Sequence, residues 1–273
     1  MLLPQSPEER IERIEANLRR FKVPKLKNPL PERPERLFVV GFGPSLVDTW
    51  KDIRDGVVLT TSGAHDFLIS KGIIPTYHVE SDSREHKVFF LRNPHPDTTY
   101  YLGSQCHPKM FARLRHNKVV MWHGYVNGSI DEHLAVANRY DPGSVLLSGG
   151  TNAGLRAVIV GRHLGFKQFV LHGIDCSYRG DVQWAGKHSG ATHHAVQVRC
   201  NDKVFNTSDI MMRATDDFFT QMFTPGLRDC SFLVAGDGLL AERLNIFRHD
   251  PEVALSPKWW APHNFHLRLK EVA

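Results

Sequence analysis

The sequence predicts an α/β fold, in which a mostly parallel sheet is covered by helices on both faces. Two observations carry this prediction. Short apolar segments recur between stretches of helical periodicity, and glycine-rich turns join some of the segments to the helices that follow. Strands buried on both faces have continuous apolar runs, and parallel neighbours need a crossover that is usually helical. We therefore expect a Rossmann-like sheet.

The N-terminal segment, residues 1–36, is expected to stand apart from this sheet. "SPEERIERIEANLRRF" at 6–21 predicts an amphipathic helix, because Ser6 and Glu9 have the spacing of a capping box. A proline-rich connector follows and reaches residue 36. The helix would pack on the body or on a partner subunit, which makes a homo-oligomer one expectation. Residues 37–273 would form a single domain.

Six apolar segments predict strands, at 37–41, 57–62, 76–82, 98–104, 118–124 and 168–175. The stretch 149–165, "GGTNAGLRAVIVGRHLG", predicts a glycine turn followed by a helix that packs on the sheet through Ala, Val and Ile. Further on, 205–223 has a helical pattern and 230–238 contains a late strand. The pattern is therefore that of alternating strands and helices.

Composition excludes several classes of protein. Lys and Arg exceed Asp and Glu by 34 to 29, a formal charge of +5, which suits an anionic small ligand but is too small and scattered to predict nucleic-acid binding. The four cysteines form no CxxC pair, so neither a disulfide framework nor a zinc ribbon is expected. No apolar run is long enough for a membrane span. We expect a cytoplasmic protein.

The first candidate site follows the strand at 37–41. Gly41, Gly43, Pro44 and Ser45 make a turn that would let the backbone approach a ligand, and the helix that follows would direct its amides at an anion. Leu46 stands where a dinucleotide-binding fingerprint would have its third glycine. The turn therefore predicts a phosphate or ribose site rather than a nicotinamide site.

Two further candidate sites follow the next two strands. Thr61, Ser62 and Gly63 precede a helix, where hydroxyls and amides suit a base, ribose or phosphate, and where Ser62 would equally serve as an N-cap. Glu80 and Asp82 end the strand at 76–82 on the same side of the chain. This is the spacing of two carboxylates that share a divalent cation such as Mg²⁺ bound to phosphates, although surface acids are also common.

The fourth candidate site combines two segments around the strand at 168–175. A second anion cradle is predicted at the start of the long helix, and Asp175 with Tyr178 would project beside it from the strand end. Lys187 and His188 follow in a glycine-flanked loop, where a lysine would offset phosphate charge and a histidine would act as a base. The residues of the cradle are Gly149, Gly150, Thr151 and Asn152.

Three segments in this order resemble one known family. "VVGFGPSL" at 39–46, "TTSGAHDFLISKGIIPTYHVESD" at 60–82 and "GGTNAGLRAVIVGRHLGFKQFVLHGIDCSY" at 149–178 are similar to the MptE-like 6-hydroxymethylpterin diphosphokinase domain. The same domain occurs in Maf-type flagellin glycosyltransferases, and its layout resembles bacterial sialyltransferases that use CMP-sialic acid. The resemblance implies that 37–273 is a nucleotide-binding transferase domain.

The resemblance leaves three functions open. One is diphosphoryl transfer from ATP to a hydroxymethyl, pterin-like acceptor, with Glu80 and Asp82 on Mg²⁺ and Lys187 as a cation. Another is glycosyl transfer from a nucleotide sugar to a small-molecule or glycan acceptor, with His188 as base and Tyr178 on phosphate. Asp175 is expected to be catalytic in either reaction. The third is a nucleotide-binding protein without catalysis.

Overall fold

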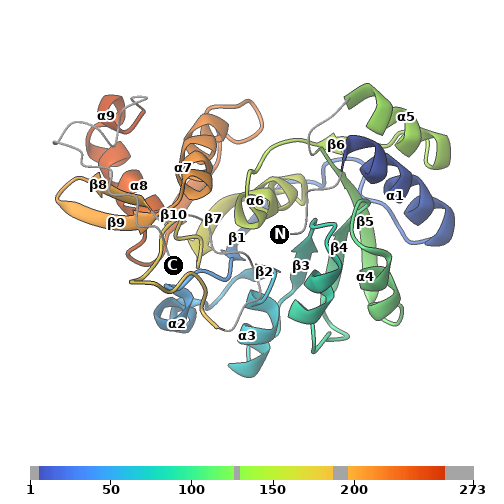
Figure 1. Ribbon diagram of the computed structural model, residues 1–273, viewed down its shortest axis with the longest axis horizontal. Helices are drawn as coiled ribbons and strands as arrows, with labels where there is room; N and C mark the ends of the chain where they lie inside the picture. Colours follow the sequence, from blue (N-terminus) through green and yellow to red (C-terminus); the bar gives the residue numbers. More distant parts are fainter. Residues whose placement is uncertain (1–5, 126–129, 187–195, 256–273) are drawn as a thin grey trace.

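The computed structural model describes residues 6–125, 130–186 and 196–255, and they form the expected α/β fold (Figure 1). Eight strands make one sheet in the order β10-β7-β1-β2-β3-β4-β5-β6, and every neighbouring pair in it is parallel. The strands are β1 (Arg33–Val40), β2 (Val57–Thr61), β3 (Tyr77–Glu80), β4 (Thr99–Gly103), β5 (Lys118–Gly124), β6 (Leu146–Leu147), β7 (Phe166–His172) and β10 (Ser231–Val234).

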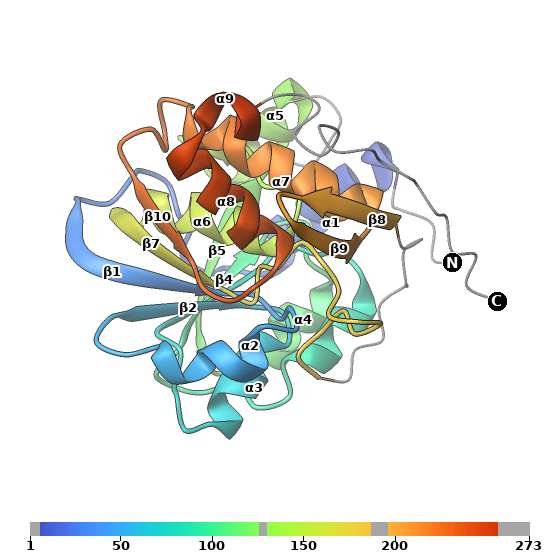
Figure 2. The ribbon, with the colours of Figure 1, turned by 90° about the vertical axis from the view of Figure 1, so that its left-hand side faces the viewer.

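Helices lie on both faces of this sheet. Figure 2 shows α2 and α3 on one side of it and α6, α7 and α8 on the other. The helices are α1 (Pro7–Arg20), α2 (Leu46–Thr49), α3 (Ala64–Ser70), α4 (Pro108–Arg113), α5 (Ile130–Tyr140), α6 (Ala153–His163), α7 (Asp209–Met222), α8 (Leu239–His249) and α9 (Pro251–Leu255), with 3-10 turns η1 (Trp50–Asp52) and η2 (Glu85–Phe90). None of the described helices has both the length and the apolar composition needed to cross a bilayer.

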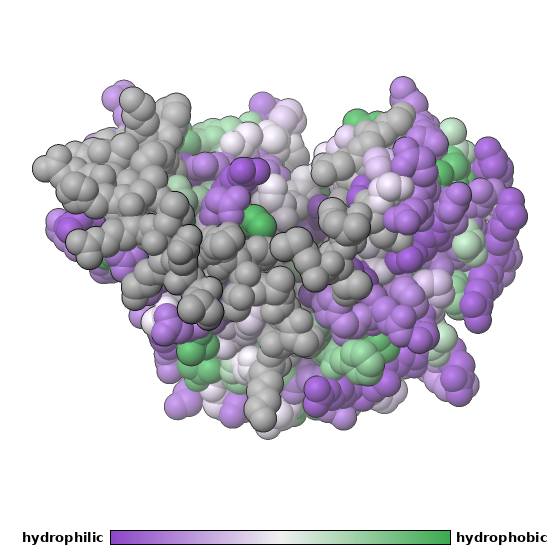
Figure 3. All heavy atoms as spheres, viewed as in Figure 1, coloured by the Kyte–Doolittle hydropathy of each residue, from purple (hydrophilic) through white to green (hydrophobic). Residues whose placement is uncertain are grey.

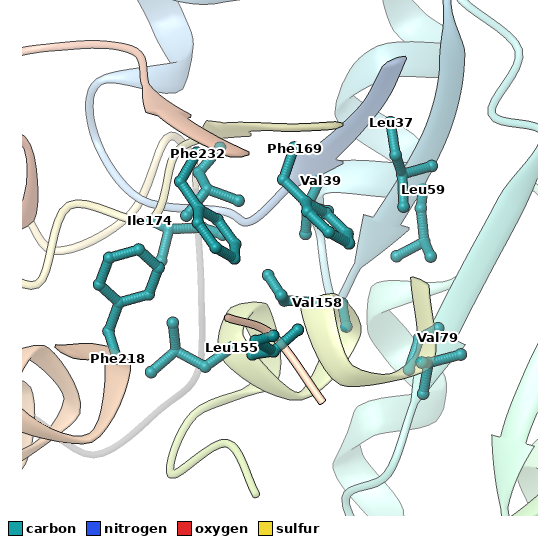
Figure 4. Packing of buried hydrophobic residues seen from close by; sticks show 14 of the residues in the cluster. Leu37, Val39, Leu59, Val79, Leu155, Val158, Phe169, Ile174, Phe218 and Phe232 are labelled. Atoms are coloured by element: carbon teal, nitrogen blue, oxygen red, sulfur yellow. The ribbon is translucent and has the colours of Figure 1, made fainter. Parts of the chain in front are cut away.

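The main hydrophobic core lies between the sheet and α6. Leu155 and Val158 of α6 pack against Val39, Leu59 and Phe169 from neighbouring strands (Figure 4). All five side chains are buried. Burying an aliphatic or aromatic side chain of this size stabilises a fold by about 1.5–3 kcal/mol. The predicted helix at 149–165 thus packs on the sheet as expected, and it fixes the position of the loop that precedes it.

Helix α1 is confirmed, with the expected capping box between Ser6 and Glu9. Its apolar face is buried within its own chain, because Ile14 and Leu18 pack into a cluster with residues of β4, α4 and β5. That face is therefore covered without a second subunit. A homo-oligomer through this helix stays a prediction.

Two sequence predictions need correction. The connector was expected to reach residue 36, but β1 begins at Arg33, whose backbone pairs with Phe166 of β7. The helical pattern at 205–223 covers only α7, since its first residues belong to β9 (Lys203–Thr207), which pairs antiparallel with β8 (Val196–Cys200). Helical periodicity cannot distinguish the last residues of a short hairpin from the first turn of the following helix.

Candidate functional site

A cleft of about 330 Å³ lies at the carboxyl ends of the central strands. The chain runs from β1 through β2 to one side of the sheet and returns to place β7 on the other side of β1. Ligands of open α/β sheets bind where the strand order reverses in this way. The lining comes from the loops after β1, β2 and β7, from the start of α6, and from 183–184 and 210–211, with Arg84 and Lys87 at one side.

The glycines after β1 are required by the neighbouring loop after β7. A Cβ atom on Gly41 would lie 2.5 Å from the carbonyl oxygen of Gly173, and one on Gly43 would lie 2.2 Å from Oδ2 of Asp175. The amide of Gly43 donates to the carbonyl of Gly173 at 2.8 Å. The glycine turn therefore lies in the cleft, but its glycines are needed first for close packing of two protein loops.

Asp175 connects the two loops from within the cleft wall. It is 5% exposed, and its Oδ2 accepts a hydrogen bond from the backbone amide of Ser45 at 3.1 Å. Burial raises the pKa of Asp175, against the effect of its hydrogen bond from Ser45. The amides of Gly43 and Ser45 are thus already bonded to protein oxygens, so a ligand at this turn would meet other groups of the loop.

Ser62 places a hydroxyl at the cleft without a cap role, whereas Ser45 lines a separate small hollow. Helix α2 starts after Ser45 and α3 starts after Gly63, and neither serine's side chain makes a capping hydrogen bond. The Oγ atom of Ser62 is buried and has no hydrogen-bond partner among the described residues. Ser62 and Thr61 line the cleft, and Ser62 has a φ of 50°. A buried hydroxyl without a partner on a strained residue is typical of a ligand-binding position.

Ser62 gives a direct test of this interpretation. We expect Ser62→Gly to raise the free energy of unfolding by up to about 1 kcal/mol, because glycine tolerates a positive φ. Nucleotide affinity should fall roughly tenfold through loss of one hydrogen bond. Urea unfolding and a nucleotide titration would measure both effects. Ser62→Ala is the matched control: it loses the same hydroxyl but keeps the strain, and unchanged affinity in both variants would exclude Ser62 from the site.

Of the anion cradle predicted before α6, only the last residue, Asn152, lines the cleft. Asn152 lines the cleft and caps α6, since its Oδ1 accepts from the amide of Leu155 at 2.9 Å. The amide of Thr151 donates to Asp217 at 2.7 Å, so a protein carboxylate already occupies it. Gly149 and Gly150, both with positive φ, form the turn before the helix and are not among the residues that line the described cleft.

A second cavity of about 720 Å³ adjoins the cleft and shares Arg84, Lys87, Asn152 and Ala153 with it. Glu80 and Asp82 both line this second cavity, so they lie on the same side of the chain, as the sequence predicted. Oε1 of Glu80 accepts from the amide of Asp82 at 2.9 Å. Burial raises the pKa of Glu80.

Asp82 is held by cations of its own chain. Its Oδ2 lies 2.5 Å from Nη2 of Arg84 and 3.6 Å from Nζ of Lys87. Burial would raise the pKa of Asp82, but the hydrogen bonds from Arg84 and the charge of Lys87 outweigh burial and lower it. Asp82 is therefore ionised and already neutralised by its neighbours.

These contacts do not fit a preformed magnesium site. Mg²⁺ prefers six oxygen ligands in near-ideal octahedral geometry, whereas one oxygen of Glu80 is bonded to backbone amides and Asp82 binds Arg84 through both oxygens. Among the residues with described structure, no three His, Cys, Asp or Glu side chains are grouped as metal ligands. The requirement for Mg²⁺ stays a prediction for the experiment below.

The remaining predicted residues lie elsewhere. Tyr178 lines a separate hollow of about 60 Å³ behind Ser45 and Asp175, and its amide donates to Asn206 at 2.7 Å. Gly63 is the N-cap of α3, where an added Cβ would lie 2.6 Å from the ring of Phe42. Lys187 and His188 lie outside the described residues.

Sequence reasoning missed the cations around the second cavity. Arg10 and Arg13 come from α1, Arg84 and Lys87 from the segment after β3, and Arg156 from the first turns of α6. Each looks like an ordinary surface charge in the sequence. Only the arrangement of α1 beside the sheet brings them together. The spacing of Arg10 and Arg13 on one helical face was the one available signal.

The fold and the cleft thus define an α/β protein with a cleft at the switch point of a parallel sheet. The family model described as "6-hydroxymethylpterin diphosphokinase MptE-like" matches residues 9–181, and the chain belongs to this MptE-like family, a family of transferases. Comparison with curated proteins gave no significant match.

A solved structure with the same fold is the Maf glycosyltransferase from Magnetospirillum magneticum AMB-1. The TM-score is 0.59 at 14% sequence identity. The match covers 88% of this chain and 41% of that chain, so this chain spans less than half of the neighbour's length. At this identity the likeness establishes the fold, and function has to be argued from the site.

Proposed function

We propose that the protein is a nucleotide-dependent transferase that moves a diphosphoryl group from ATP to a hydroxymethyl, pterin-like acceptor. The observation that carries the proposal is the pair of adjoining cavities that share Arg84 and Lys87. A donor in the glycine cleft and an acceptor in the second cavity would meet at these two cations. The family description supports the choice of reaction.

The shared cations would hold the donor's phosphates. Lys87 is 9% exposed, and within the described part of the chain both it and Arg84 form an ion pair with Asp82. Phosphoryl transfer depends mainly on positioning and on stabilisation of negative charge, which Arg and Lys supply through charge-assisted hydrogen bonds. Arg84 and Lys87 could therefore exchange the carboxylate of Asp82 for the phosphates of a nucleotide when it enters the cleft.

The bond changes follow from the proposed reaction. The acceptor hydroxyl oxygen attacks the β-phosphorus of ATP, a new O–P bond forms, and the bond from that phosphorus to the bridging α-phosphate oxygen breaks to release AMP. The hydroxyl proton goes to a base. His188 is the residue we propose for a base and Lys187 for an additional cation, on the grounds of their residue types and of their place in the sequence shortly after Trp184, which lines the cleft. Asp175 is proposed as a positioning residue, since its carboxylate bonds Ser45.

Glycosyl transfer from a nucleotide sugar is the second candidate. Two observations favour it. One is the fold likeness to a Maf glycosyltransferase. The other is that two cations, Arg84 and Lys87, face the single carboxylate of Asp82, which leaves one positive charge to balance phosphate without a divalent ion. In this reaction the same cleft would hold CMP or a related nucleotide. The acceptor would be a glycan or another small hydroxyl compound. A cytoplasmic location stays a prediction in either case.

A thermal-shift panel separates the candidates. ATP, GTP, CMP, CDP, UDP and CMP-sialic acid would each be added with Mg²⁺ or with a chelator. A ligand at 100 times its Kd adds about 2.7 kcal/mol of stability, which is readily measured as a higher Tm. We expect ATP to stabilise the protein, and we expect AMP and a diphosphorylated product after 6-hydroxymethylpterin is added.

Each outcome of the panel has a defined meaning. Stabilisation by CMP or CMP-sialic acid, with or without metal, would replace the first candidate by glycosyl transfer. Stabilisation by ATP without any turnover would indicate a nucleotide-binding protein, and no stabilisation by any compound would reject the nucleotide cleft. Lys87→Gln is the site variant and should lose most of the shift. The matched control is Lys71→Gln, whose lysine lies over the rings of Trp50 and Phe67 outside the cleft.

A further inference from the structure

A further cavity, of about 670 Å³, lies at the amino ends of β4 and β5. Thr99 and Lys118, the first residues of these two strands, line it, whereas the cleft lies at the carboxyl ends of the central strands. Its other walls are the segment after α1 and the end of α4. Within the described chain it shares no lining residue with the cleft or with the second cavity. Its volume is that of an ordinary ligand site, but it stands apart from the proposed reaction.

The floor of this cavity is apolar. Phe111, Leu114 and Val119 are buried in it, and Phe21 and Val23 are half-buried beside them. All five belong to the hydrophobic cluster that holds α1 on the sheet. Figure 3 shows mainly hydrophilic side chains, with a few apolar patches, at the end of the molecule that carries α1 and α5. An apolar group of a ligand would therefore be buried on this floor next to a hydrophilic surface.

Four exposed cations surround the apolar floor: Arg20, Lys22, Arg115 and Lys118. None of the residues that line the cavity is acidic, and none of the four cations has an ion-pair partner within the described part of the chain. We call this cavity, with its four cations, the basic pocket. Its charge and its floor together favour an occupant that is both anionic and apolar.

Helix ends account for only part of this positive charge. Helix α1 ends at Arg20 and α4 ends at Arg113, and the carboxyl end of a helix carries about half a negative charge. Two helix ends therefore balance about one of the four cations. Lys22 serves this role, because its Nζ donates to the carbonyl of Leu18 at 3.2 Å. The remaining cations would be balanced by acidic groups of a bound molecule.

The edge of β5 adds main-chain hydrogen-bonding groups to the basic pocket. Met121 of β5 donates to the carbonyl of Pro24 and accepts from the amide of Leu26, each at 2.8 Å. Peptide groups alternate in direction along a strand, so those of Val119 face the same side as those of Met121. The residue placed to donate to Val119 is Pro24, which has no N–H. Among the described residues the segment after α1 makes no hydrogen bond to Val119, so an added peptide could pair there.

We infer that the basic pocket binds an acidic peptide segment of a partner protein. The peptide places an apolar side chain on the floor, its carboxylates beside the four cations, and its main chain along Val119. Addition of an extended peptide to a strand edge is a recurring mode of recognition, in which the main chain gives affinity and side-chain pockets give specificity. The inference does not depend on the proposed function, because the basic pocket and the cleft have no residue in common.

Three other occupants fit the basic pocket less well. A second copy of this chain, bound through the same face about a two-fold axis, would bring like charges together. Single-stranded nucleic acid stacks its bases on aromatic rings, but the ring of Phe21 already stacks on Phe111 at 4.7 Å and carries the guanidinium of Arg20 at 5.2 Å. A membrane surface takes up apolar side chains that project from a protein, whereas these side chains line a hollow.

Fluorescence anisotropy of the full chain with synthetic peptides tests the inference. The probe is a labelled peptide of sequence Glu-Glu-Leu-Glu-Glu. Two control peptides replace either the glutamates by glutamine or the leucine by serine. We expect saturable binding of the acidic peptide, and binding at least tenfold weaker for each control peptide, because one removes the charges and the other the buried apolar group. Added salt should weaken binding of the acidic peptide, since exposed charges are screened.

A double variant locates the binding site of the peptide. Arg115→Gln combined with Lys118→Gln removes two exposed cations of the basic pocket, so peptide affinity should fall at least tenfold while the Tm stays unchanged. The matched control combines Lys51→Gln with Arg54→Gln. It removes the same two kinds of charge from exposed positions outside this pocket, the cleft and the second cavity, and it should leave peptide affinity unchanged.

Three results would overturn the inference: no binding of the acidic peptide to the wild type, equal peptide affinity in the two double variants, or an oligothymidylate that binds the basic pocket more tightly than the peptide does. Nucleotide affinity of the cleft should be equal in the wild type and both double variants. A protein that binds the peptide but no nucleotide would reject the proposed function alone, and the reverse result would reject this inference alone.

Discussion

Asp175→Ala is expected to lower the free energy of unfolding by about 1–3 kcal/mol and to abolish nucleotide binding. The alanine leaves the buried amide of Ser45 without an acceptor, and a buried donor without a partner carries a cost of this size. It also removes one of the contacts between the turn after β1 and the loop after β7, which the backbone hydrogen bond from Gly43 to Gly173 still joins. Urea unfolding and the nucleotide thermal shift would measure the two losses.

Asp175→Asn tells a positioning role from a chemical one. The amide oxygen of asparagine can accept the same hydrogen bond from Ser45, but no charge remains. If Asp175 positions the turn, as its contacts favour, the asparagine variant should keep near-wild-type stability and nucleotide affinity and lose turnover only a few-fold. A loss above 100-fold in a stable variant that still binds nucleotide would assign the carboxylate to the chemistry.

The architecture was predictable because local sequence patterns determine it. Each apolar segment after residue 37 forms a strand, and the helix after Asn152 packs where its Ala, Val and Ile pattern indicated. The position of β10 next to β7 was not predictable from those patterns. It depends on which sheet edge the chain reaches after α7, and a short strand does not specify its neighbour.

The site was predictable in position but not in its details. The turn at 41–45 was expected to open the backbone to a ligand, whereas its glycines make room for Gly173 and Asp175. The sequence spacing of a glycine turn is the same in both cases, because either use requires the absence of a side chain. The cations of the second cavity were missed, since they come from α1, the segment after β3 and α6. Only tertiary packing brings such distant charges together.

Acidification is expected to destabilise the protein between about pH 6.5 and pH 4. Burial lowers the pKa values of His123, His133 and His172 to about 4, and the unfolded chain would bind protons near the ordinary value of 6.5. The unfolded state therefore binds more protons than the native state in this range, so stability is complete above pH 6.5 and falls as the pH decreases. One pKa unit corresponds to about 1.4 kcal/mol, so each histidine contributes on the order of 3 kcal/mol.

The contribution of one histidine can be isolated by substitution. Nε2 of His133 is buried without a partner among the described residues, so His133→Leu removes a titrating group without breaking a hydrogen bond at that atom. Its unfolding free energy should depend less steeply on pH, by about 1.4 kcal/mol per pH unit where one proton is involved.

The matched control for His133→Leu is His116→Asn, at an exposed position, which should leave the slope unchanged. Glu80 and Asp175 act in the opposite direction, because burial raises their pKa values and native-state protonation then favours folding as the pH falls. Both acids are present in the wild type and in both histidine variants. Their contributions to the pH dependence therefore cancel when the slopes of two variants are compared. Equal slopes for His133→Leu and the wild type would show that the pKa of His133 in the native state is not lowered.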